Sequence, residues 1–508
     1  MGWPVPFSTI PTPNEDAEVV ANESSSTHQR FARDVIVVGA ATGLVALSTI
    51  FTVPLLTRTL GVTDYGIWAQ SYATISIALV IAGLGLSYPI MRFLPAKTDK
   101  AAVRDDIYSV LCLSLLSTLV ASVTMVIFAG PIARTFFDGA TQVVRLTALI
   151  ILVYSPTSMC LTYFRSSSLM KTYALYVLMD AYGQVVVVAY SVLSGHGLVS
   201  IFISVAALRT LLLALLLISM VRQIGVARPR FLRTKEYLRF ALPAMPALLS
   251  WWVVSSSDRY VIARYLGLDS VGIYSAAYSI GNIIILIVSV LGLVLTPTLS
   301  RLYDEEKMAE LSIQISYSLK YFLMLAIPFV VGAAVLARPL LTLFSTPNLA
   351  SRGNVVLPLI ALSILLYGTH VIVAQVLLLT KKTALLGLVW VAAAALNLGL
   401  NIAIVPHLGI TGSAVSSLIA YALVLGIVSY HSYRHVRFPL DWRFLVKSLV
   451  ASGLMALVVW FMSPETRPQT VAAVIAGVVV YALGLLLLRA IRKDEIDFFR
   501  GLLRGRSG

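Results

Sequence analysis

The chain contains nearly the same stretch twice, as TRTLGVTDYGIWAQSY at Thr57–Tyr72 and as ARYLGLDSVGIYSAAY at Ala263–Tyr278. When Arg58 is aligned with Arg264, 206 residues later, a leucine, two glycines, an isoleucine and a tyrosine also align. A second pair, SGHGLVSIFIS from residue 194 and PHLGITGSAVS from residue 406, has an offset of 212 residues. Two matches at almost the same offset predict a chain built from two similar halves.

The composition predicts an integral membrane protein. Of the 508 residues, 58% are hydrophobic and only 12% are charged, whereas soluble domains carry about 25% charged residues. The two cysteines, Cys112 and Cys160, lie in apolar stretches, so the sequence predicts neither a disulfide framework nor a metal site. The polar segment before residue 34 lacks the basic-then-apolar order of a signal peptide, and we expect a disordered tail there.

Fourteen stretches are long and apolar enough to cross a bilayer, which takes about 20 residues per helix. They are residues 34–58, 65–88, 107–129, 142–164, 173–192, 198–221, 238–258, 271–294, 315–342, 355–379, 384–405, 411–431, 443–462 and 470–488. Lysines and arginines number 28 on one side of these spans and 8 on the other. Because the more positive side is normally cytoplasmic, we expect a cell-membrane protein with both termini in the cytoplasm. This topology explains the net charge of +15, so no nucleic-acid partner is predicted.

The repeat also predicts how the spans are arranged. The first copy joins spans one and two, and the second joins spans seven and eight, so both copies have the same orientation in the membrane. We therefore expect an all-α polytopic membrane protein with two parallel six-helix lobes and two further helices, as in transporters that alternate access to a central cavity. The predicted parts are a disordered cytoplasmic tail (1–33), a first lobe (34–221), a basic cytoplasmic linker (222–237), a second lobe (238–431), spans thirteen and fourteen (432–489) and a basic cytoplasmic tail (490–508).

Three segments carry a resemblance to a known superfamily. They are TRTLGVTDYGIW from residue 57, LRFALPAMPALLSWWVVSSSDRYVIARYLG from residue 238, and TKKTALLGLVWVAAAALNLGLNIAIVPHLGITGSAVSS from residue 380. In this order, on fourteen spans between Arg33 and Arg489, they resemble the multidrug/oligosaccharidyl-lipid/polysaccharide (MOP) exporters. Within that superfamily they resemble the polysaccharide-transport branch of Wzx-like O-antigen flippases.

The resemblance implies the fold of the MATE multidrug exporters and the lipid II flippases. It implies a flippase that carries a polyprenyl-(pyro)phosphate-linked oligosaccharide from the cytoplasmic to the outer leaflet by alternating access. Glycan polymerases and glycosyltransferases of the same pathway would be its partners, and spans thirteen and fourteen would flank a lipid-tail groove. Lipid II flippases and multidrug/cation antiporters are the alternatives. Lipid II flippases have several cationic residues in the early spans of the first lobe, whereas spans one and two here have none at mid-membrane.

Two charged residues lie deepest in the predicted spans, Asp180 in span five and Arg209 in span six. Such charges cost at least ~2.5–3.5 kcal/mol each, so they normally face a cavity or a partner. At 1.5 Å per residue, Asp180 lies about 11 Å and Arg209 about 18 Å above the inner ends of their spans, a gap that an arginine can bridge. One interpretation is a structural ion pair. The other is a substrate-phosphate site at Arg209, with Asp180 as its counter-charge or as a titrating group.

Neutral polar residues within the spans are further candidates for a cavity wall. A histidine side chain can titrate near neutral pH, so His370 would suit proton coupling, although a lone intramembrane histidine more often hydrogen-bonds a neighbouring helix. Asn397 and Asn401 share one helix face and would contact sugar hydroxyls or pack against another span. The same alternatives apply to four more amides, which are Gln70, Gln184, Asn282 and Gln375.

Charged residues also mark the outer ends of spans one and seven. We expect Asp258 and Arg259 to end span seven at the outer interface, where water is available. With Arg58 and Arg264 they would form an outer gate, or they would simply anchor the helix ends.

The sequence predicts a transporter and not an enzyme. It has no glycine-rich loop followed by Lys-Ser/Thr, so we expect no ATPase and no cofactor. The energy for transport would come from an H⁺ or Na⁺ gradient, from the gradient of the sugar-lipid, or from downstream consumption of the sugar-lipid. A membrane glycosyltransferase, polymerase or ligase would need catalytic groups on large outer loops, and the predicted outer loops are short. A scaffold without transport would need neither Asp180 nor Arg209.

Overall fold

The computed structural model describes residues 37–49, 51–95, 97 and 99–490. All regular secondary structure in this part of the chain is helical, and fourteen of its helical segments are long and apolar enough to cross a membrane. The number and order of the spans therefore confirm the prediction. Apart from Ala490, the two predicted tails lie outside the described residues.

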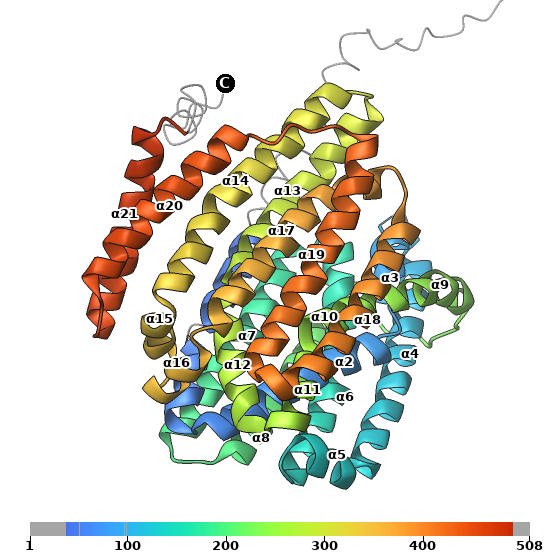
Figure 1. The fold of residues 1–508 in the computed structure, drawn as a ribbon. Coiled ribbons are helices and arrows are strands. Elements are labelled where there is room, and N and C mark those ends of the chain that lie inside the picture. The colour runs from blue at the N-terminus through green and yellow to red at the C-terminus, as the bar shows by residue number, and fades with distance from the viewer. Residues whose placement is uncertain (1–36, 50, 96, 98, 491–508) are drawn as a thin grey trace, which may run out of the picture.

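The first lobe contains spans one to six (Figure 1, blue to green). Its helices are the first span at Val37–Thr59, α2 at Val62–Ala82, α3 at Ser87–Phe93, α4 at Lys100–Ile127, α5 at Ala129–Phe136, α6 at Thr141–Ser166, α7 at Met170–Leu193 and α8 at Leu198–Ile224. Helix α3 continues the course of span two, and α5 is a short amphipathic helix between spans three and four.

The second lobe contains spans seven to twelve (Figure 1, green to orange). Its helices are α9 at Thr234–Ala241, η1 at Leu242–Ala244, α10 at Met245–Ser256, α11 at Asp258–Leu266, α12 at Leu268–Gly281, η2 at Asn282–Ile284, α13 at Ile285–Asp304, α14 at Met308–Val335, α15 at Ala337–Phe344, α16 at Pro347–Gly353, α17 at Val356–Leu379, α18 at Thr383–Leu408 and α19 at Ile410–His435. The 3₁₀ turn η1 interrupts the span between α9 and α10. It contains Pro243 and is followed by Pro246, and proline lacks the amide hydrogen that would continue an α-helix.

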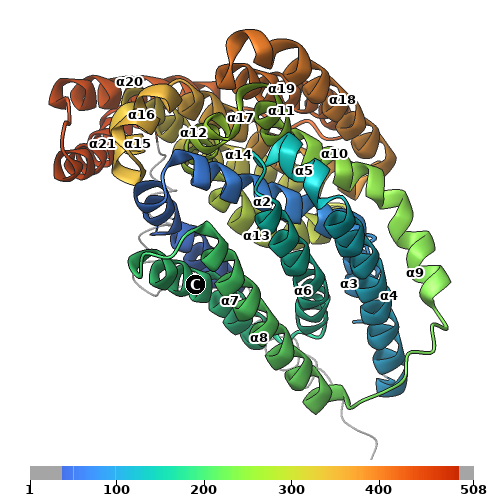
Figure 2. The ribbon, with the colours of Figure 1, turned by 90° about the horizontal axis from the view of Figure 1, so that it is seen from below.

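Equivalent helices have equivalent neighbours in the two lobes. In the first lobe α6 lies against α2, α4 and α8, and α7 packs along α8. In the second lobe α17 lies against α12, α14 and α19, and α18 packs along α19. The lobes are therefore parallel repeats, as predicted. Spans thirteen and fourteen, α20 at Trp442–Met462 and α21 at Arg467–Leu487, pair with each other outside the lobes, against α14 and α15 (Figure 2).

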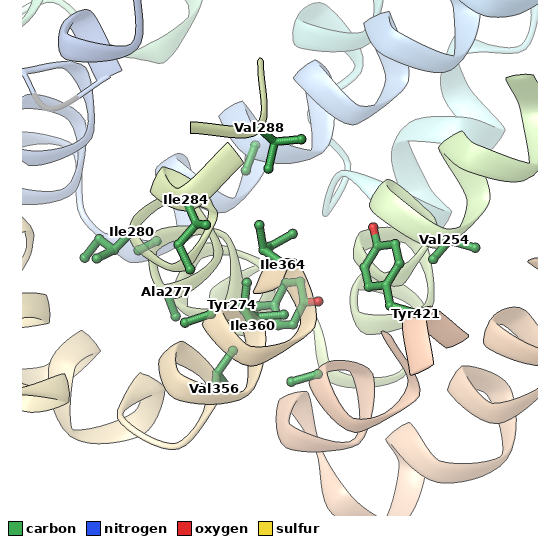
Figure 3. Close-up of a cluster of buried hydrophobic side chains, with 14 of the residues drawn as sticks. Val254, Tyr274, Ala277, Ile280, Ile284, Val288, Val356, Ile360, Ile364 and Tyr421 are labelled. Atoms are coloured by element: carbon green, nitrogen blue, oxygen red, sulfur yellow. The ribbon is translucent and has the colours of Figure 1, made fainter. Parts of the chain in front are cut away.

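The core of the second lobe forms where α12, η2 and α13 pack on α17. Figure 3 shows this buried cluster, which includes Tyr274, Ala277 and Ile284 on one side and Ile360 and Ile364 on the other. Lipid tails are as apolar as these side chains, so close packing between helices stabilises the cluster more than removal from water does. The cluster fixes α12, which carries the second copy of the repeated stretch.

The two lobes touch at several places, and the repeated stretch gives the largest of these contacts. Helices α2 and α12 cross at Gly66 and Gly272, the equivalent glycines of the two copies. A Cβ atom added to either glycine would overlap a backbone carbonyl group of the other helix, that of Leu268 or Val62. The missing side chains permit the two backbones to cross closely near the N-terminal ends of α2 and α12. Figure 2 shows these helices where the lobes meet. This crossing gives a physical reason for the chain to contain the stretch twice.

Span seven ends close to where the sequence predicts, at Ser256, but Asp258 just beyond it is not exposed to water. The sequence places Asp258 and Arg259 at the outer interface, but the helix only breaks at Ser257 and continues as α11 to Leu266. Asp258 is fully buried, with 0% of its surface exposed. The expectation that water surrounds Asp258 was wrong, because this carboxylate is neutralised by its own neighbour and hydrogen-bonded by Tyr274, which lets it lie inside the bundle.

Candidate functional site

A polar cavity of about 340 Å³ lies between the lobes, beside the glycine crossing; we call it the central cavity. Its lining combines hydroxyl-bearing, aromatic and small side chains with an arginine, and consists of Ser48, Thr49, Thr52, Val53, Tyr65, Trp68, Ala69, Tyr72, Ala73, Ser76, Gln184, Ser256, Arg259, Ser275 and Ser279. An adjoining side cavity of about 400 Å³ extends between spans one and eight. The two cavities share Thr49, Val53, Arg259 and Ser279, so they form one inter-lobe space.

Arg259, at the start of α11, lines both cavities. Its Nη1 donates to Asp258 Oδ1 and to the Ser255 carbonyl oxygen, both at 3.1 Å. The guanidinium carbon lies 4.5 Å from the ring centre of Tyr278 and 5.8 Å from that of Tyr274, within cation–π range. Among the described residues Nε and Nη2 have no hydrogen-bond partner, so these donors are available to a ligand in the cavity.

The two lobes contribute different chemistry to this space. With the offset of 206 residues, the equivalent of Arg259 is Val53 in span one, and Val53 lines both cavities as well. Both lobes therefore supply hydroxyl groups and the first lobe supplies the aromatic rings of the central cavity, while the positive charge comes from the second lobe. A guanidinium with free donors binds phosphate oxygens in bidentate geometry. The arrangement suits an anionic ligand that also carries hydroxyl groups.

Asp180 and Arg209 form the predicted pair, but they lie behind the cavity wall. Arg209 Nε is 3.4 Å from Asp180 Oδ1, and Arg209 Nη2 is 3.3 Å from Gln184 Oε1. The guanidinium lies 4.1 Å from the ring centre of Tyr154, and only 3% of Arg209 is exposed. Tyr72 donates to Gln184 Oε1 at 2.6 Å, and both of these residues line the central cavity. The pair therefore reaches the cavity through Gln184 and Tyr72.

The remaining polar candidates are spread over the bundle. Asn282 lines the side cavity. Gln70 is fully buried, and neither atom of its amide group has a hydrogen-bond partner among the described residues. His370 is buried with ring centres 5.5 Å from Trp390 and 6.3 Å from Tyr367, and it lines neither cavity. Of these three candidates, only Asn282 reaches the inter-lobe space.

Asn397 and Asn401 hold α18 to α19. Asn401 Nδ2 donates to Asn397 Oδ1 at 3.3 Å, and its Oδ1 accepts from the Ser413 hydroxyl of α19 at 2.6 Å. Both asparagines are fully buried and line neither cavity.

We expect Asn401→Leu to lower the free energy of unfolding by about 1 kcal/mol, because hydrogen bonds between membrane helices contribute ~0.6 to 1.7 kcal/mol. Thermal unfolding in detergent measures this loss, with Ser417→Ala, also on α19, as the control. Ser417 is buried but its hydroxyl has no partner among the described residues, so its removal should be neutral. A weakened affinity for the transported ligand in Asn401→Leu would contradict a purely structural role.

The residues of the predicted outer gate have separate partners. Arg58 donates to the carbonyl groups of Leu343 and Ser345, where α15 ends. Asp258 is paired inside span seven, and Arg264 is exposed at the end of α11. The structure therefore does not bring Arg58, Asp258 and Arg264 into one charged cluster.

Other contacts hold the two lobes together near the glycine crossing. Thr63 donates to Asp269, which occupies the equivalent position in the second copy of the repeat. The ring of Phe136 in α5 lies edge-on to Tyr260 in α11, with centres 5.3 Å apart. Helix α5 of the first lobe thus touches α11, which follows span seven, while the end of α15 in the second lobe accepts hydrogen bonds from the end of span one.

The sequence interpretation placed Arg259 at a helix end or in an outer gate and did not place it in a binding cavity. A signal for it was present, because the repeat aligns Arg259 with Val53, six residues before the end of the first span at Thr59. By that alignment Arg259 is equivalent to a residue inside the first span. Its oppositely charged neighbour, Asp258, lowers the cost of burying its charge.

Comparison with known proteins gives matches along most of the chain. The sequence profile of the family described as Polysaccharide biosynthesis protein matches residues 31–303, and that of MatE matches residues 243–403. The succinoglycan biosynthesis transport protein ExoT of Rhizobium meliloti is 25% identical over 479 residues, covering 88% of this chain and 91% of that protein. The probable flippase AglR of Haloferax volcanii is 26% identical over 251 residues; the match covers 47% of this chain and about half, 52%, of that protein.

Solved structures share the fold. A lipid II flippase MurJ in an inward closed conformation superposes with a TM-score of 0.71 at 17% identity, covering 89% of this chain and 98% of that chain. The MATE multidrug transporter DinF-BH superposes with a TM-score of 0.60 at 14% identity, covering 80% of this chain and 95% of that chain. At these identities the likeness shows the architecture alone.

Proposed function

This chain belongs to the polysaccharide biosynthesis protein family, in the polysaccharide branch of the MOP exporter superfamily, and on this premise we propose that it is a flippase. Its substrate is a polyprenyl-(pyro)phosphate-linked oligosaccharide, which it carries from the cytoplasmic to the outer leaflet by alternating access. Relatives named as a succinoglycan transport protein and a probable flippase support this proposal. The chain carries its substrate across without catalysing a reaction.

The observation that carries the proposal is the divided chemistry of the inter-lobe space. Arg259 offers two free donors to a phosphate group, and the hydroxyls and rings from spans one and two suit the sugars. Because this space lies where the lobes meet, rocking one lobe against the other would expose it to each side in turn.

The same lining favours an oligosaccharide flippase over the lipid II flippase. Among the residues that line the two cavities, spans one and two supply no lysine or arginine. The cation comes from the second lobe instead. A multidrug/cation antiporter is less well supported, because a guanidinium with free donors attracts anions.

A third cavity suits the lipid tail of the substrate. It measures about 310 Å³ and lies between α14 and α15 on one side and α20 and α21 on the other. Its walls include Pro328, Gly332, Met455 and Gly477 and are almost entirely apolar. A polyprenyl chain in this cavity would stay in an apolar environment while the head group crosses between the lobes.

Orientation, coupling and partners complete the proposal. The excess of lysine and arginine on one side supports cytoplasmic termini in the cell membrane, which puts the glycine crossing at the outer face. Asp180, with 23% of its side chain exposed, is the candidate group for coupling to an H⁺ or Na⁺ gradient. Enzymes that assemble or polymerise the glycan would act before and after the flippase.

Flipping by Arg259 variants tests the proposal. In proteoliposomes that contain a fluorescent polyprenyl-diphosphate-linked oligosaccharide, we expect Arg259→Gln to flip about 10–100-fold more slowly than the unchanged protein. The reason is that hydrogen bonds to charged groups contribute about 1.5–3 kcal/mol. A membrane-impermeant quencher measures the fraction in the outer leaflet.

Arg264→Gln is the matched control, because Arg264 lies on the same helix but is exposed and lines neither cavity. It should flip like the unchanged protein. Equal rates for Arg259→Gln and Arg264→Gln would remove Arg259 from the site. A protein that inserts but flips no lipid-linked glycan would overturn the proposed function.

A further inference from the structure

A separate polar cavity of about 450 Å³ lies at the inner end of the first lobe; we call it the inner cavity. It opens between α3, α6 and α7, away from the second-lobe arginine of the central cavity. Hydroxyl groups dominate its lining, which consists of Ser87, Tyr88, Met91, Ser158, Leu161, Thr162, Arg165 and Tyr173.

The inner cavity is one end of a row of cavities along span two. A small cavity of about 110 Å³ shares Ser87, Tyr88 and Ser158 with it and continues along α2 to Leu79. Ser76, less than one helical turn further along α2, belongs to the central cavity. The row therefore runs from the inner end of the first lobe to within one helical turn of the inter-lobe space.

Arg165 is the charged residue of the inner cavity, and it differs from the other arginines near this row. Arg209 is paired with Asp180, and Arg259 with Asp258. The guanidinium of Arg165 is half-buried and has no hydrogen-bond or ion-pair partner among the described residues.

Topology alone does not explain a half-buried arginine. Lys171, six residues later at the start of α7, is exposed and lines none of the cavities described above. Such a residue provides positive charge for orientation at no cost in desolvation. Arg165, in contrast, loses part of its hydration and gains no partner among the described residues. An anionic ligand would replace the lost hydration.

We propose that the inner cavity is a loading site that binds the diphosphate of the lipid-linked glycan, and its first sugar, before the substrate moves to the central cavity. This inference rests on the proposed function and adds a second binding site to it. The diphosphate lies against Arg165, whose planar guanidinium donates to two phosphate oxygens at once. The hydroxyls of Ser158 and Thr162 and the exposed ring of Tyr88 contact the sugar.

The position along α6 suits loading. Tyr154, which lies over the guanidinium of Arg209, is three turns of α6 before Arg165. At 1.5 Å per residue, the inner cavity is about 16 Å nearer the inner end than that pair. A lipid-linked head group in the inner leaflet therefore meets Arg165 first and moves along the row toward the inter-lobe space.

Calorimetry on the purified full chain tests the loading site without requiring transport. All proteins carry Arg259→Gln, so that binding at the central cavity is weakened, and geranylgeranyl diphosphate is the probe. We expect a further Arg165→Gln change to weaken binding about tenfold or more, because hydrogen bonds to charged groups are lost. Adding Lys171→Gln instead should leave the affinity unchanged. Equal affinities with and without Arg165 would overturn the loading site.

A second probe distinguishes the two sources of a lipid phosphate. Short-chain phosphatidylglycerol offers a phosphodiester without a diphosphate. If the site takes the carrier lipid, phosphatidylglycerol binds several-fold more weakly than the diphosphate. If both probes bind equally and both depend on Arg165, the inner cavity is a phospholipid head-group site, and the loading proposal is wrong.

Flipping by the single variant Arg165→Gln completes the test. A loading site predicts that half-maximal flipping needs a higher substrate content while the maximal rate is kept, and that Arg165→Lys restores part of the loss. A lower maximal rate with unchanged half-saturation would contradict loading. If the unchanged protein flips nothing, the proposed function fails, while the calorimetry still decides whether the inner cavity binds a diphosphate.

Discussion

Adding one methyl group at Gly66 should separate the two lobes at their outer ends and slow flipping at least tenfold. The Cβ atom of Gly66→Ala would overlap the carbonyl group of Leu268 and lie 3.2 Å from the backbone nitrogen of Gly272. Both are backbone atoms of α12, so no side chain can turn away. Overpacking of this kind costs about 1–3 kcal/mol, which is enough to reverse the balance between two conformations of similar energy.

Labelling measures that separation directly. In a chain in which Cys112 and Cys160 are replaced, a cysteine at Ser279 would lie in the inter-lobe space. We expect a membrane-impermeant maleimide to label it faster from outside in Gly66→Ala. Gly272→Ala, on the other side of the crossing, should behave alike.

Gly399→Ala is the control for helix propensity. A Cβ atom at Gly399, within α18, would meet nothing within 4 Å. This change should stabilise the protein slightly, by about 0.5–1 kcal/mol, because glycine is disfavoured inside a helix. Unchanged flipping and labelling in Gly66→Ala would show that the crossing does not limit transport.

The spans and the lobes could be predicted because they are local or duplicated properties. Whether Val356–Leu379 crosses the membrane depends on its own length and hydrophobicity, and the sequence predicts 355–379. The two lobes follow from an offset that any alignment of the chain with itself reveals. The relative orientation of the two copies in the membrane follows from the number of spans between them, because an even number returns the chain to the same side.

The site could be predicted only in part, because it depends on which helix faces meet. Asp180 and Arg209 were predicted to pair, since each has few partners at that depth, but their place behind Tyr72 and Gln184 depends on how span two packs. The burial of the Asp258–Arg259 pair was missed because a charged residue at the edge of an apolar run is compatible with both a helix end and a buried pair.

The asparagines and the repeated glycines show the same limit. The sequence allows Asn401 to contact either a sugar or another helix. The structure shows that its amide oxygen accepts a hydrogen bond from Ser413 of α19. Gly66 and Gly272 were recognised as repeated, but a repeat does not reveal that its copies touch. That contact arises only when α2 and α12 cross, which depends on the packing of both lobes.

Removing the carboxylate of Asp258 should cost the most stability of any single change at the site. Asp258 accepts hydrogen bonds from the Arg259 side chain at 3.1 Å, from the Arg259 amide at 2.9 Å and from the Tyr274 hydroxyl. Asp258→Ala leaves Arg259 without its counter-charge inside the bundle. Breaking a buried pair in this way costs about 3–5 kcal/mol, and the position of Arg259 on the wall of a polar cavity favours the lower end.

The double variant separates the structural role of Asp258 from the functional role of Arg259. In Asp258→Ala/Arg259→Met no unpaired charge remains, so we expect most of the lost stability to return, since an apolar replacement of a buried pair is often neutral. Flipping should nevertheless stay as slow as in Arg259→Gln, because the phosphate-binding donors are absent. Thermal unfolding and flipping, measured on the same preparations, give both results. If flipping recovers together with stability, Arg259 serves only to neutralise Asp258, and the phosphate site must lie elsewhere in the inter-lobe space.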